Sequence, residues 1–156
     1  MNIKLDKMQY HPNLTSYYLG LASIILNIIY VFKVLSIMEP TVIVGIKILL
    51  NIVLLLITFL ANEKIKYYSK YYALLMIIVG VLVLLRLLYV PIQVFNGTVV
   101  LKTNMNRVKI GFYLTTILIL MSFCYCTSGI IGLNKHIRLE RYKSSVDMKK
   151  VLDEYE

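Results

Sequence analysis

One apolar run, residues 71–95, constrains the fold of this chain more than any other feature. It reads YYALLMIIVGVLVLLRLLYVPIQVF and holds one charged residue, Arg86. Because a helix of about 20 apolar residues crosses the hydrocarbon core of a bilayer, this run is long enough to span a membrane. Lipid offers backbone N–H and C=O groups no hydrogen-bond partner, so the expected structure is a helix.

Three further apolar runs occupy most of the remaining 156-residue chain, in which 59% of residues are hydrophobic. That share lies above the range of soluble globular domains. We therefore predict an all-α integral membrane protein with four transmembrane helices in an up-down bundle. The predicted spans cover residues 16–38, 41–61, 71–95 and 110–133, and Pro91 leaves open an earlier end of the third span at residue 90.

The distribution of lysine and arginine predicts the orientation of these spans. Most of them lie in the N-terminal segment, the second loop and the tail, whereas the third loop holds Lys102, Arg107 and Lys109. Since cytoplasmic segments collect basic residues, we expect both termini to be cytoplasmic, in the cell membrane of a bacterium or in an organelle membrane. The net charge of +9 is dispersed over these segments, so nucleic acid is not an expected partner.

Three cations lie inside the predicted spans: Lys33, Lys47 and Arg86. Lys33 and Lys47 are about 8 and 9 Å from the outer ends of their spans, and Arg86 is about 13 Å from residue 95 if the helix continues that far. No span contains an acidic residue, and Glu39, in the connection between the first two spans, is the nearest carboxylate. A charge in hydrocarbon is costly enough to call for a reason.

Two interpretations of these cations stay open. In the first, the two lysines extend their ammonium groups to the interface, and carbonyls freed by Pro91 hold Arg86. In the second, Lys33, Lys47 and Arg86 form a candidate anion or partner site that converges on a phosphate, a carboxylate or a partner's acidic side chain. Glu39 would then be an internal counter-ion.

Polar residues also recur at helical spacing along each span. Asn27 in the first span and Asn51 in the second lie near the middle of the membrane, and we expect them to pack the helices and to hydrogen-bond one another. Cys124 and Cys126 are two residues apart and point to nearly opposite sides of a helix, so we interpret them as packing residues.

The chain divides into a transmembrane domain, residues 1–133, and a basic cytoplasmic tail, residues 134–156. Ser144 and Asp147 predict the start of a short amphipathic helix at the end of this tail. The basic stretch 135–143 precedes it and is suited to anionic lipids at the membrane surface, while the helix could instead dock on a cytoplasmic partner.

No residue pattern predicts a catalytic centre, a metal site or a cofactor, and His11 and His136 both flank the spans without an evident carboxylate partner. We predict a non-enzymatic accessory subunit of a larger membrane complex, a transporter or a respiratory assembly, whose partners are other integral membrane subunits. The alternative is a small membrane protein that binds or transports an anionic lipid or metabolite through Lys33, Lys47 and Arg86.

Overall fold

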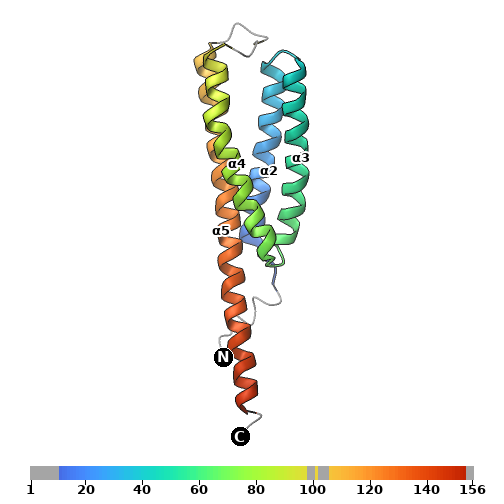
Figure 1. Cartoon of the computed structure of the whole chain (residues 1–156), viewed down its shortest axis with the longest axis vertical. Helices are drawn as coiled ribbons and strands as arrows, with labels where there is room; N and C mark the ends of the chain where they lie inside the picture. Colours follow the sequence, from blue (N-terminus) through green and yellow to red (C-terminus); the bar gives the residue numbers. More distant parts are fainter. Residues whose placement is uncertain (1–10, 98–100, 102–105, 154–156) are drawn as a thin grey trace.

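The described part of the chain is all-helical (Figure 1). The computed structural model describes residues 11–97, 101 and 106–153. These residues form α2 (Leu14–Ile37), α3 (Val42–Ile65), α4 (Lys70–Phe95) and α5 (Arg107–Asp153). All four helices are long and apolar enough to cross a membrane, as the hydropathy of the sequence predicts.

Side-chain caps fix the starts of the first two helices. The Asn13 side chain accepts a hydrogen bond from the backbone N–H of Ser16 at 3.4 Å, and Thr41 accepts one from Val44 at 3.3 Å. Such caps satisfy N–H groups that the first turn of a helix leaves without a partner. The connection between α2 and α3 is therefore only four residues long, 38–41. We call this end of the bundle the connection end.

Helix α4 passes through Pro91 and ends at Phe95, so the helix continues to the later of the two ends that the sequence left open. Proline removes one backbone hydrogen bond from a helix, and here this loss falls in the last two turns. Gly97, two residues past the end of the helix, has a φ of +72°, the left-handed conformation that favours glycine after a helix C-terminus.

The most extensive helix contact joins α4 to α5. Gly129 allows it, because a Cβ atom there would lie 2.7 Å from the carbonyl oxygen of Ala73. At Gly80, a Cβ atom would lie 2.5 Å from Sγ of Cys126, and Ser122 donates a hydrogen bond to the Gly80 carbonyl at 2.8 Å. Small residues of this kind let membrane helices approach closely.

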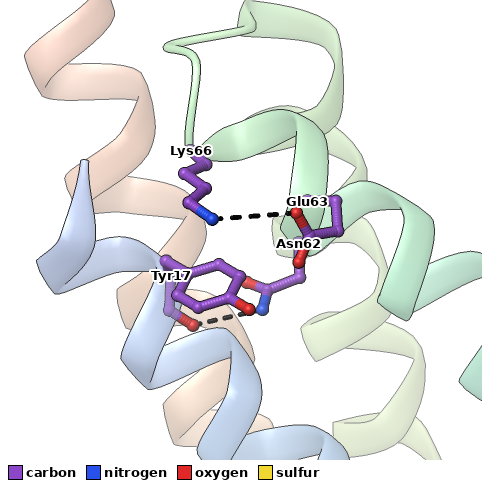
Figure 2. Close-up of polar contacts among 4 residues, drawn as sticks. All are labelled: Tyr17, Asn62, Glu63 and Lys66. Atoms are coloured by element: carbon purple, nitrogen blue, oxygen red, sulfur yellow. Dashed lines mark hydrogen bonds and ion pairs between the residues drawn. The ribbon is translucent and has the colours of Figure 1, made fainter. Parts of the chain in front are cut away.

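Polar contacts join the helices at the end opposite the connection end. The Ser128 hydroxyl on α5 donates to the Ser16 carbonyl on α2 at 2.7 Å. Figure 2 shows Asn62 of α3 donating to the Tyr17 carbonyl of α2 at 3.1 Å, with Lys66 paired to Glu63 at 3.9 Å. These bonds hold the start of α2 against the end of α3 and the middle of α5.

Burial is uneven among the four helices. Within the apolar window of each helix, 44% of α5 is buried but only 17% of α3. Helix α3 presents most of its large apolar side chains outward, among them Ile46, Leu49, Leu50, Val53, Leu56 and Leu60. Most of the large, fully buried side chains lie instead on α4 and α5, among them Met76, Val83, Leu114, Leu118, Met121 and Tyr125.

Helix α5 is 47 residues long and extends well past the other three helices (Figure 1). The expectation of a separate helix that begins near Ser144 is wrong. Ser144 and Ser145 do not cap a new helix, because their hydroxyls donate to the carbonyls of Arg141 and Tyr142 in the preceding turn. No Gly or Pro occurs after Gly132, so nothing in the chain interrupts α5.

Candidate functional site

Lys47 and Arg86 lie in one pocket at the side of the bundle, toward the connection end. The pocket holds about 150 Å³ and lies between α3 and α4, with one α2 side chain at its wall. Its lining residues are Tyr30, Lys47, Leu50, Asn51, Arg86, Tyr89 and Val90.

Helical spacing explains how two distant segments supply this pocket. Lys47 and Asn51 are four residues apart on α3, so their side chains share one face. Arg86, Tyr89 and Gln93 are spaced by three and four on α4 and also share a face. The two faces meet where α3 packs on α4, and Tyr30 of α2, which is 4% exposed, closes the pocket.

Each of the two cations donates a hydrogen bond to a neutral side-chain amide. Arg86 donates through Nη1 to Oδ1 of Asn51, and Lys47 donates through Nζ to Oε1 of Gln93 at 2.6 Å. The Lys47 ammonium also lies 5.3 Å from the centroid of the Tyr89 ring, within the range of a cation–π interaction.

These contacts leave the positive charge of the pocket uncompensated. Across the described residues, Lys66 pairs with Glu63 and the His136 ring lies 3.6 Å from a Glu140 oxygen, both far from this pocket in the bundle, and no ion pair involves Lys47 or Arg86. Glu39, the carboxylate expected as their counter-ion, is exposed and forms no ion pair within that part of the chain. Within the described residues, Lys47 and Arg86 therefore have no acidic side chain paired with them.

Lys33 lies apart from this pocket. It lines a second, larger cavity of about 440 Å³ between α2 and α5, together with Lys109. The structure thus brings Lys47 and Arg86 together in one pocket. It places Lys33 in a different cavity, with Lys109, which the sequence assigned to the third loop. Lys109 and Tyr113 are four residues apart, so their shared helix face was the available signal for this cavity.

The hydrogen bond expected between Asn27 and Asn51 is not among the contacts of the described residues. The Asn51 oxygen is used by Arg86, and a charged donor makes the stronger bond. Asn27 is fully buried and, like Ser23, lies beside the Tyr125 hydroxyl. Neither the oxygen nor the nitrogen of its side-chain amide has a hydrogen-bond partner within the described residues.

No family model, curated protein or solved structure matches this chain. In the described residues, no group of three His, Cys, Asp or Glu side chains is placed to hold a metal ion.

Proposed function

We propose that the four helices span a membrane as an up-down bundle with both termini cytoplasmic, and that the chain is a non-enzymatic accessory subunit of a larger membrane complex. In this arrangement the connection end faces outward. Lys47, five residues into α3, then lies about 8 Å below the outer end of that helix. The Lys47–Arg86 pocket would open sideways, toward lipid or toward a neighbouring helix.

The uncompensated pair of cations carries this proposal. A pocket of about 150 Å³ lies below the range of about 300–1,000 Å³ typical of small-molecule sites, but it can admit one carboxylate group. A single Asp or Glu on a partner's transmembrane helix could pair with both cations and would cancel one of their two positive charges. Charged residues in membrane helices commonly pair in this way, because the alternative is an isolated charge in hydrocarbon.

The surface beside the pocket suits a partner helix. Helix α3 has the smallest buried share of the four, and Leu50, at the edge of the pocket, is 55% exposed. A second helix could therefore pack on the exposed apolar side of α3 next to this pocket.

Gentle extraction from the native membrane tests this proposal. The wild-type protein is expected to co-purify with other integral membrane proteins in mild detergent. The double variant Lys47→Gln/Arg86→Gln is expected to lose them. The control Lys64→Gln/Lys70→Gln removes the same charge from two exposed lysines at the opposite end of the bundle and is expected to retain them. Recovery of the wild-type chain alone would refute the proposal.

Binding of an anionic lipid through the same pocket is the second candidate function. The rim of the pocket favours lipid binding, because Leu50 and Tyr89 are both more than half exposed. Their side chains lie where acyl chains would pack beside a bound phosphate. Arg86→Ala would then abolish retention of phosphatidylglycerol in native mass spectra while the bundle stays folded. Retention at the wild-type level would exclude this candidate.

Anionic lipid is also the partner proposed for the basic part of the tail. Residues 135–143 belong to the portion of α5 that follows the predicted span, and Arg138, Arg141 and Lys143 are exposed there. Basic side chains beside a membrane are attracted to anionic headgroups by about 1 kcal/mol each. A flotation assay with phosphatidylglycerol vesicles tests this contact. It compares a peptide covering 134–156 with the same peptide carrying Arg138→Gln/Arg141→Gln/Lys143→Gln.

A further inference from the structure

The cavity between α2 and α5 at the connection end is the larger of the two cationic cavities. It holds about 440 Å³, within the range of about 300–1,000 Å³ usual for small-molecule sites. Helix α2 contributes Lys33 and Ile37, and α5 with the residue before it contributes Asn106, Lys109, Ile110 and Tyr113. This cavity shares no lining residue with the Lys47–Arg86 pocket, so an inference about it is independent of the proposed function.

Two lysines give this cavity its charge. Lys33 and Lys109 come from different helices, and both are exposed. The Lys33 ammonium lies 5.5 Å from the centroid of the Tyr113 ring, which positions it while leaving its N–H groups able to donate. None of the described residues that line the cavity is acidic. An anion in the cavity would therefore meet two positive charges and no negative one from these residues.

The other lining groups add direction and an apolar wall. Oδ1 of Asn106 accepts the backbone N–H of Val108 at 3.2 Å, so the side-chain NH2 group is the part of Asn106 that can donate to a ligand. Ile37 and Ile110 lie on the apolar side of the cavity, and the Tyr113 ring adds a flat surface. A ligand that fits has a compact anionic group with several acceptor oxygens, attached to a small carbon skeleton.

We propose that this cavity binds a phosphate ester. Lysine binds phosphate as a point charge, and two ammonium groups with an amide NH2 match several oxygens of one phosphate better than the two oxygens of a carboxylate. The volume accommodates the ester's carbon skeleton as well as the phosphate. The ester could be the headgroup of an anionic phospholipid or a soluble phosphorylated metabolite, and these two sources can be separated by experiment.

Isothermal titration calorimetry of the full-length protein in a neutral detergent, at fixed ionic strength, tests the proposal. The four probes are short-chain phosphatidylglycerol, short-chain phosphatidylcholine, glycerol 3-phosphate and acetate. Binding of phosphatidylglycerol alone identifies a lipid headgroup, and binding of glycerol 3-phosphate identifies a soluble ester. Absence of binding by both, equal binding of the two lipids, or acetate binding as tightly as either phosphate ester would overturn it.

Matched variants locate the binding. Lys33→Gln/Lys109→Gln is expected to weaken the affinity for the phosphate ester by about tenfold or more, since each lysine provides a charged hydrogen bond. Lys64→Gln/Lys70→Gln removes the same net charge elsewhere and is expected to change it less than about twofold. Lys33→Arg/Lys109→Arg keeps the charge, tests that the site tolerates substitution, and is expected to bind. Unchanged affinity in the glutamine variant would overturn the proposal.

Discussion

Arg86 on α4 donates a hydrogen bond to the side-chain oxygen of Asn51 on α3. The bond joins two helices through a charged group and a neutral amide, both within segments apolar enough to span a membrane. Asn51 is 5% exposed, so its oxygen has little access to water. The amide satisfies one donor of the guanidinium but leaves its charge in place, and the same holds for Gln93 and Lys47.

Replacement of Asn51 by leucine should destabilise the bundle. The change removes the acceptor of a charged donor and adds apolar volume next to it, which costs about 1–3 kcal/mol. Thermal unfolding in detergent, followed by far-UV circular dichroism, measures this. Leu50→Ala on the exposed side of α3 is the control, and an equal loss in both variants would show that the Arg86–Asn51 bond contributes nothing specific.

Asn51→Asp separates the structural role of this contact from partner binding. The new carboxylate would sit beside Arg86 and cancel one of the two positive charges from within. We expect the protein to fold as well as the wild type but to lose the co-purifying membrane proteins, because Arg86 is then paired inside the chain and the new carboxylate repels a partner's acidic side chain. Co-purification at the wild-type level would contradict the proposal that an acidic side chain of a partner enters this pocket.

The close contact of α4 and α5 depends on glycine at position 129. Gly129→Ala places a Cβ atom 2.7 Å from the Ala73 carbonyl oxygen, so the helices must move apart. Overpacking of this kind costs about 1–3 kcal/mol. Gly45→Ala is the matched control, since no atom lies within 4 Å of its added carbon, and it should be neutral or slightly stabilising. Similar melting temperatures for both variants would be inconsistent with this packing.

His136 links the connection between α3 and α4 to α5. Its Nδ1 atom lies 2.6 Å from the Tyr68 carbonyl oxygen, and Tyr68 itself adopts the left-handed conformation with φ of +59°. His136→Ala should reduce the free energy of unfolding by about 1 kcal/mol through loss of this bond. Arg138→Ala, two residues further along α5 and exposed, should have no measurable effect on the free energy of unfolding. A larger loss of stability in Arg138→Ala than in His136→Ala would contradict the contact between His136 and Tyr68.

The sequence predicts the number and approximate bounds of the helices because long apolar runs have few alternatives. Residues 71–95 were expected as one span, and α4 covers Lys70–Phe95. Helix α3 ends at Ile65 instead of residue 61, since polar residues such as Asn62 can continue a helix when they gain a tertiary bond. Hydropathy cannot detect that bond.

Side-chain partners were less predictable than the helices that carry them. Spacing along each span identified Lys47 with Asn51 and Arg86 with Gln93 as neighbours on one face. It did not determine how each helix is rotated about its axis, and that rotation decides that Arg86 meets Asn51 and that Lys33 meets Tyr113. One of the two interpretations of the sequence therefore groups all three cations in one site, although they line two cavities.

The continuity of α5 gives a last prediction about distance. Phe123 and Met148 are both exposed on this helix, and the 25 positions between them correspond to about 38 Å at the rise of an α-helix. Spin labels at these two positions, in a chain with Cys124 and Cys126 replaced by serine, should give a single narrow distance near this value by pulsed electron paramagnetic resonance. The substitution Ser144→Pro should shorten the mean distance and broaden its distribution, because proline kinks or breaks a helix. A short or broad distribution without the proline would mean that the tail is a separate element.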